Sequence, residues 1–201
     1  GYSDDVRVLR GAVNGDFGDG RRSTSLFVQL SGGERDAASG ASGLSRADAS
    51  REFWKVNARA AHYRDLSANT GLYLAADGQW SPDALLASEE FAVGGAPYGR
   101  GYNYAELSGD RGVAGTAELR VGWDPKRPPI TFVQGYGFVD AAQVWNRGGD
   151  SAALASTGLG VRVRVGERVT VGLEAAKPLT RTPYERGDKD WRTFVSISAR
   201  F

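Results

Sequence analysis

The clearest pattern along the chain is the alternation of apolar and polar residues near its C-terminal end. Over residues 191–201, Trp, Thr, Val, Ile, Ala and Phe fall on one face, while mostly Ser and Arg fall on the other. A period of two is typical of a β-strand with one apolar face. The segments 159–165 and 169–175 repeat the pattern. Only two residues, 166–167, separate them, which predicts a tight hairpin.

Similar alternation, less regular, marks the earlier part of the chain. Further strands are expected at 4–13, 22–31, 50–64, 69–80, 113–123 and 130–146. The sequence therefore predicts an all-β chain of about nine strands, most near the ~9–11 residues that cross a bilayer at a tilt. Ser81 followed by Pro82 also predicts a short helix over 81–90, because both residues favour a helix start.

A soluble β-sandwich would alternate as well, but three features favour an antiparallel transmembrane β-barrel. Charged side chains occupy the polar face at mid-strand, as in a polar lumen. Aromatic residues lie at strand ends, as at a membrane interface; these are Trp80, Trp123, Trp145, Trp191 and Phe201. Connections alternate between short (14–21, 65–68, 124–129, 166–167) and long (32–49, 81–112, 147–151, 180–190). Short turns face the periplasm in such barrels, which places loop 81–112 on the outer side, from where it can fold inward.

Composition removes several classes of function. Lys and Arg total 25 and Asp and Glu total 24, for a net charge of +1, so no nucleic-acid partner is expected. The chain has no Cys and a single His62, and neither Ser108-Gly109-Asp110 nor the glycine-rich tracts match a catalytic or phosphate-binding motif. We expect no enzyme activity, no cofactor and no metal site. The acidic residues Asp83, Glu89 and Glu90 are expected on a solvated surface rather than at a calcium site.

Two segments carry a family resemblance. Residues 91–102 (FAVGGAPYGRGY) resemble the F-x-L-G-G … V-R-G-Y/F loop of the BamA-type outer-membrane superfamily. The continuation over 106–120 and the strand 137–145 (GFVDAAQVW) are most similar to its two-partner secretion branch, the TpsB or hemolysin secretion/activation transporters. The resemblance covers residues 50–201 and ends on a terminal aromatic residue. Gly99 and Ala142 depart from it, because Val and Gly are usual there.

The resemblance implies a sixteen-stranded outer-membrane barrel preceded by periplasmic POTRA domains. On this interpretation residues 1–201 are the C-terminal portion of the barrel, about 8–9 strands, without POTRA domains. Single-chain bacterial barrels have even strand numbers, so either segment 4–13 is not a barrel strand or the chain is a fragment. A closed barrel of about eight strands has room only for side chains, and loop 81–112 would not fit inside it. This favours the fragment.

The resemblance also implies that the tip of the loop is held inside the pore. We define this loop lock as Arg100, Gly101 and Tyr102 of the loop with Phe138 and Asp140 of the strand. A guanidinium can meet a carboxylate through two parallel hydrogen bonds, and flanking glycines let a backbone approach a wall closely. The alternative is a solvent-exposed Arg100, with Asp140 paired to Arg162.

Other residues have expected roles in the same barrel. Arg and Glu side chains on the polar face give either a conduit that an unfolded chain can pass or a salt-bridged interior; these lumen charges are Glu118, Arg120, Arg162, Arg164 and Glu174. Phe201 is expected to be the signal that the outer-membrane insertion machinery reads.

The predicted function is export of an unfolded partner exoprotein across the bacterial outer membrane. Its expected partners are outer-membrane lipid, the secreted exoprotein and the insertion machinery. One alternative is a BamA-like or TamA-like assembly factor, in which the same barrel opens laterally. Another is a small closed barrel that acts as an adhesin or a membrane enzyme.

Overall fold

The computed structural model describes residues 5–35 and 45–200, and the regular structure in them is entirely β. The strands are β1 (Val6–Asp19), β2 (Arg22–Arg35), β3 (Glu52–Asp65), β4 (Thr70–Trp80), β5 (Phe91–Val93), β6 (Leu107–Gly109), β7 (Arg111–Trp123), β8 (Ile130–Trp145), β9 (Ser151–Val165), β10 (Val169–Pro178) and β11 (Arg192–Ala199). In this part of the chain no helix is long and apolar enough to cross a membrane.

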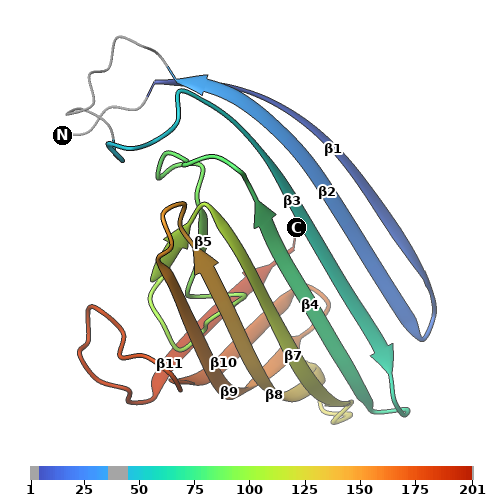
Figure 1. Cartoon of the computed structure of the whole chain (residues 1–201). Coiled ribbons are helices and arrows are strands. Elements are labelled where there is room, and N and C mark those ends of the chain that lie inside the picture. The colour runs from blue at the N-terminus through green and yellow to red at the C-terminus, as the bar shows by residue number, and fades with distance from the viewer. Residues whose placement is uncertain (1–4, 36–44, 201) are drawn as a thin grey trace.

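Nine of the strands form one antiparallel sheet, in the order β1-β2-β3-β4-β7-β8-β9-β10-β11 (Figure 1). Neighbours in the sheet are neighbours in the sequence except at β4 and β7, between which the chain makes the long loop 81–110. The sheet curls strongly, with β1 and β11 at its two edges. The prediction of about nine antiparallel strands is confirmed, and the described part of segment 4–13 contributes to β1 of the sheet.

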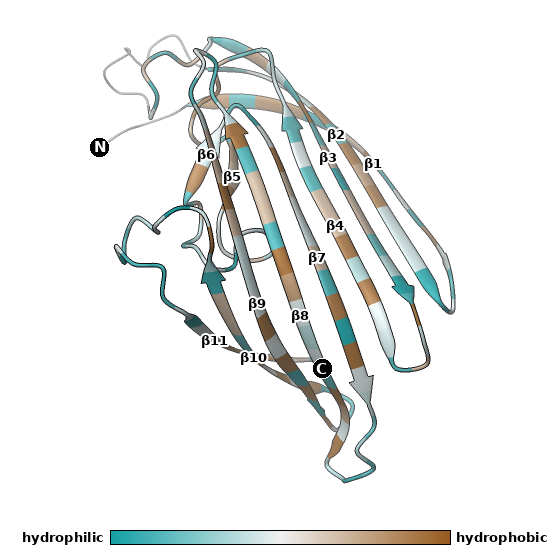
Figure 2. Cartoon of the chain, turned by 60° about the horizontal axis from the view of Figure 1, so that its bottom comes forward, coloured by the Kyte–Doolittle hydropathy of each residue, from teal (hydrophilic) through white to brown (hydrophobic). Residues whose placement is uncertain are grey.

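The two faces of the curled sheet differ sharply in character. Large apolar side chains are exposed on the convex face; among them are Leu9, Val13, Leu26, Val28, Leu30, Leu74, Val113, Leu119, Val139, Leu159, Leu173, Val195 and Ile197. Among the described strands, charged residues with this orientation occur only within two residues of a strand end, as at Arg7, Arg64, Arg111 and Lys177. Figure 2 shows the resulting apolar and polar alternation along the strands. An exposed apolar face of this extent is typical of a membrane-facing surface.

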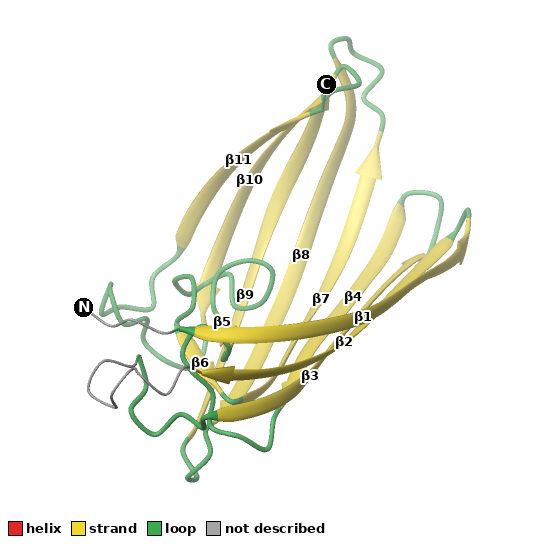
Figure 3. Cartoon of the chain, turned by 90° about the horizontal axis from the view of Figure 1, so that it is seen from above, coloured by secondary structure: helices red, strands yellow, loops and turns green. Residues whose placement is uncertain are grey.

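Mid-strand charges lie on the concave face. Glu118 of β7 is opposite Phe138 of β8, and Arg162 of β9 is opposite Gly172 of β10, all on this side. Seen from above, the sheet curves around loop 81–110, which lies inside the curve (Figure 3). The most buried part of the molecule is therefore the contact between this loop and the concave face.

Two local predictions need correction, and one element was missed. The first turn comprises only residues 20–21, because β1 continues to Asp19. Residues 81–90 form turns and bends instead of a helix. Ser81 Oγ does accept a hydrogen bond from the Asp83 amide at 3.1 Å, but the Leu85 amide donates to the Asp110 carboxylate at 2.6 Å. This tertiary partner replaces the bond that a helical turn would have made. The hairpin β5–β6 within the loop was also not predicted.

Candidate functional site

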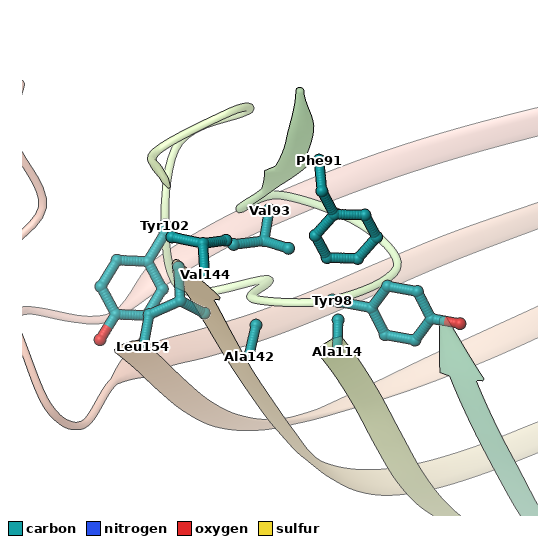
Figure 4. Close-up of a cluster of buried hydrophobic side chains, with 8 residues drawn as sticks. All are labelled: Phe91, Val93, Tyr98, Tyr102, Ala114, Ala142, Val144 and Leu154. Atoms are coloured by element: carbon teal, nitrogen blue, oxygen red, sulfur yellow. The ribbon is translucent and has the colours of Figure 1, made fainter. Parts of the chain in front are cut away.

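The loop 81–110 is packed against the concave face through an apolar cluster. Its side chains come from both partners, the loop and strands β7, β8 and β9 (Figure 4); they are Phe91, Val93, Tyr98, Tyr102, Ala114, Ala142, Val144 and Leu154. Burial of aromatic rings against small wall residues such as Ala114 and Ala142 stabilises the folded-in loop. The cluster lies beside the loop tip and positions Arg100 for its polar contacts.

Arg100 lies at the loop tip and makes a two-pronged contact with Asp140 of β8. Its Nη2 lies 2.9 Å from Asp140 Oδ1, and its Nε lies 3.1 Å from Oδ2. The Asp140 residue is 0% exposed and Arg100 is 7% exposed. Two parallel bonds between buried, oppositely charged groups fix both the direction and the distance of the loop tip.

Arg100 also binds two further carboxylates from separate strands. Its Nη1 lies 3.0 Å from Glu118 Oε2 of β7 and 3.2 Å from Glu174 Oε2 of β10. The guanidinium carbon sits 3.3 Å from the centroid of the Phe138 ring. One loop residue therefore contacts β7, β8 and β10 at once.

Neighbouring arginines balance the three carboxylates. Arg120 Nε lies 2.7 Å and Arg162 Nη1 lies 3.0 Å from Glu118 Oε1. Arg162 also stacks over the Tyr136 ring at 3.8 Å, and the Tyr136 hydroxyl donates to Glu174 Oε2 at 2.8 Å. Such a network holds charges apart from the apolar cluster and gives each buried group a partner.

The backbone at the tip completes the Asp140 site. The amides of Gly99 and Arg100 donate to Asp140 Oδ2 at 3.3 Å and 3.0 Å, and Ser156 Oγ donates to the same oxygen at 3.2 Å. Gly99 has φ +94°, and a Cβ at Gly101 would lie 2.6 Å from the amide nitrogen of Pro178. Both glycines are therefore needed for the approach of the tip to the wall.

The remaining predicted site residues lie as follows. Tyr102 is 1% exposed and belongs to the apolar cluster instead of packing on the Arg100–Asp140 pair, and its hydroxyl donates to the Ala155 carbonyl at 3.0 Å. Arg164 lies at the end of β9, 5.4 Å from the Phe132 ring centroid. Phe201 lies outside the described residues.

A cavity of about 530 Å³ opens beneath the tip, lined by Arg100, Glu118, Arg120, Arg162 and Glu174 among others.

A second cluster of buried polar residues was not predicted from the sequence. Glu89 was expected on a solvated surface, but it is 5% exposed and lies 2.9 Å from Lys55 Nζ of β3. Asp110 is 1% exposed and lies 2.6 Å from Nη1 of Arg46 in the preceding long loop. The one available signal was Leu85-Leu86 beside Glu89-Glu90, since an apolar pair next to acids marks a segment that is partly buried.

Hydrogen bonds shift the pKa values of Arg46 and its neighbour Asp48 in the directions that favour their charged forms. The hydrogen bond from Arg46 lowers the pKa of the Asp48 carboxyl below its ordinary value. Burial acts to lower the pKa of Arg46, but hydrogen bonds to Asp48 and Asp110 outweigh it and raise that pKa above its ordinary value. No group of His, Asp or Glu residues suited to a metal ion occurs in the part of the chain that the structure describes.

A family model decides the identity of the chain. Residues 19–163 match the model described as "Haemolysin secretion/activation protein ShlB/FhaC/HecB". The chain belongs to this family. The matched range contains the loop, the tip and β8, so the resemblance seen in the sequence is confirmed.

Two solved structures share the fold. CdiB from Escherichia coli superposes with a TM-score of 0.80 at 19% identity, over 98% of this chain and 37% of that one. CdiB from Acinetobacter baumannii gives 0.56 at 19% identity, over 96% of this chain and 42% of that one. No curated protein matches the chain in sequence. The chain thus spans about two fifths of the length of these relatives.

The family membership establishes the kind of protein from which the chain comes. The chain is an outer-membrane β-barrel region of a two-partner secretion transporter, as predicted. By its description, the family consists of haemolysin secretion/activation proteins.

Proposed function

We propose that this chain forms the C-terminal part of an outer-membrane pore that exports an unfolded partner exoprotein. The observation that carries the proposal is the loop 81–110, folded against the polar concave face and held there by Arg100. A charged, hydrated lumen offers an unfolded chain few apolar surfaces to stick to. A loop that occupies this lumen at rest closes the path until it is displaced.

Because the solved relatives are longer than this chain, the proposal extends to the domains of the full-length protein. Residues 1–201 supply nine strands of the barrel. The remaining strands and periplasmic POTRA domains belong to the full-length protein on this proposal. The apolar convex face contacts outer-membrane lipid, because its exposed side chains are apolar except near the strand ends.

Insertion into the membrane is proposed to depend on Phe201. A terminal aromatic residue at the periplasmic interface can be read by the insertion machinery and also anchors well there. Deletion of Phe201 from the full-length protein should reduce the amount assembled in the outer membrane more than it reduces the stability of the refolded barrel. Equal losses in both assays would instead indicate a packing role.

Export itself is tested by secretion of the partner. The full-length gene is expressed together with the gene of a candidate exoprotein, a large secreted protein sought among the neighbouring genes. The exoprotein in the medium is measured by immunoblot. We expect export with the intact transporter and retention in the periplasm without it. Export that is unchanged when the transporter is absent would overturn the proposal. Arg164→Ala serves as a control, because this lumen arginine lies away from the loop tip.

A further inference from the structure

The base of loop 81–110 is held by a buried carboxylate that has no part in the loop lock. Glu89 Oε1 lies 2.6 Å from Arg10 Nη2 of β1, and Glu89 Oε2 lies 2.9 Å from Lys55 Nζ of β3. The Glu89 carbonyl accepts two more bonds, from Lys55 Nζ at 2.6 Å and from Gln79 Nε2 of β4 at 3.0 Å. One loop residue therefore joins three strands of the sheet.

Burial makes this contact costly to lose. The Lys55 side chain is 9% exposed and that of Glu89 is 6% exposed. A buried ammonium group needs a negative partner, because its desolvation is not otherwise offset. Glu89 supplies that partner through both its carboxylate and its carbonyl.

Residues around Glu89 make further contacts that hold the loop base in place. Gln79 also donates to the Asp110 carbonyl at 3.3 Å. The Asp110 carboxylate accepts the Leu85 amide at 2.6 Å and the Arg147 amide at 2.7 Å. Leu86 is 2% exposed and packs on Ala49 and Val6. The loop base is thus tied to both its own ends and the first strands.

The two anchor points lie on different parts of the curved sheet. Arg100 contacts β7, β8 and β10, whereas Glu89 contacts β1, β3 and β4, on the other side of the strand order. Arg100 and Glu89 share none of these partners. Loss of one contact leaves the other intact.

We propose that Glu89 is a positioning residue that fixes the base of the loop on the β1–β3 wall, independently of Arg100 at the tip. The inference rests on the proposed function in that the loop occupies the pore. Release of the tip alone leaves the loop tethered through Glu89, so the pore clears only in part. Full clearance requires both contacts to break.

The experiment measures access to the loop base in the assembled, full-length protein. The chain contains no cysteine, so Leu86→Cys provides a single label site here once any cysteine elsewhere in the protein is replaced. The reaction rate with a water-soluble maleimide then reports opening of the base. Glu89→Gln should raise this rate by at least about tenfold, because hydrogen bonds to charged groups each contribute a factor of that size.

Matched variants separate positioning from general loosening. Asp77→Asn removes a carboxylate from the same wall, where Asp77 pairs with Arg59 at 2.7 Å, and should leave the rate unchanged. Glu89→Asp keeps the charge and should give an intermediate rate. If Glu89→Gln does not assemble, as judged by heat-dependent gel mobility, Lys55→Gln removes the same ion pair from the barrel side.

Two results would overturn the inference. One is an unchanged labelling rate in assembled Glu89→Gln or Lys55→Gln; the other is an equal rise in Asp77→Asn. The labelling assay needs no exoprotein, so its outcome is distinct from that of the export assay. If the full-length protein fails to export but still shows this labelling pattern, the proposed function is refuted and the positioning role of Glu89 is supported.

Discussion

At the residue scale, the site depends on how a few side chains satisfy one another when water is removed. Arg100 has three carboxylate partners, and Asp140 receives bonds from two amides and a hydroxyl in addition to the guanidinium. Removal of one member of a buried pair leaves the other charge without compensation, whereas removal of both relieves it. The coupling between Arg100 and Asp140 is therefore the most informative quantity at this scale.

A double-mutant cycle measures that coupling. Arg100→Ala and Asp140→Ala should each lower the free energy of unfolding of the full-length barrel by about 3–5 kcal/mol, and the double variant should be little worse than either. Urea unfolding in detergent micelles provides the values. Arg164→Ala is the control and should change stability by less than about 0.5 kcal/mol. Fully additive losses would show that the two residues act separately.

Gly99 gives a second prediction at this scale. The family usually has Val at this position, yet Gly99 here has φ +94°, and a Cβ would lie 2.8 Å from Leu154 Cδ1. Gly99→Val should therefore destabilise the folded-in loop by about 1–3 kcal/mol, despite matching the usual family residue. Protease sensitivity of the loop reports the change. Ala92→Val adds similar bulk at an exposed strand position and should have little effect; a stabilised Gly99→Val would contradict the account.

At the scale of elements, alternation made the barrel strands predictable. Charge at mid-strand on one face and apolar side chains on the other distinguish β9 and β10 from sandwich strands, and the register places Val161 and Leu173 side by side on the convex face. The loop was less predictable. Residues 81–90 have a local helix signal, but Asp110 takes the Leu85 amide. A contact between residues 25 apart leaves no local pattern.

The lack of a local sequence pattern also explains why part of the candidate site could not be predicted. The loop lock was expected from a motif, whereas Glu89 was expected on a solvated surface and Asp110 was given no site role. Their burial arises only when β1, β3 and the preceding loop come together around the loop base. Tyr102 was expected beside the ion pair, but the apolar cluster takes its ring and the Ala155 carbonyl takes its hydroxyl.

The convex face of β10 provides the prediction at this scale. Leu173 lies at mid-strand, between Val161 of β9 and Val195 of β11. Leu173→Arg should cost about 2–4 kcal/mol, because a mid-strand position on this face lies near the bilayer midplane. Thr170→Arg adds the same charge to the concave face, which lines the cavity, and should be tolerated better. The amount of each variant in purified outer membranes and its refolding stability check the difference, and equal effects would argue against a lipid-facing convex side.

At the scale of the whole molecule, the curved sheet and its inward loop form one unit. The nine strands present an apolar outside and a charged inside, and loop 81–110 is anchored to the inside at both its tip and its base. The proposed function accounts for this combination, since a secretion pore needs a wall for lipid and a path for protein. The central claim is that the loop occupies the pore at rest and that Arg100 keeps it there.

Single-channel conductance of the full-length protein in planar bilayers tests this claim most directly. Arg100→Ala should raise the mean conductance and the frequency of open events, because a released tip frees part of the lumen. Arg100→Ala combined with Glu89→Gln should raise both further, since the base contact is then lost as well. Arg164→Ala should behave like the unaltered protein. Conductance that is identical in the unaltered protein, Arg100→Ala and the double variant would contradict the account.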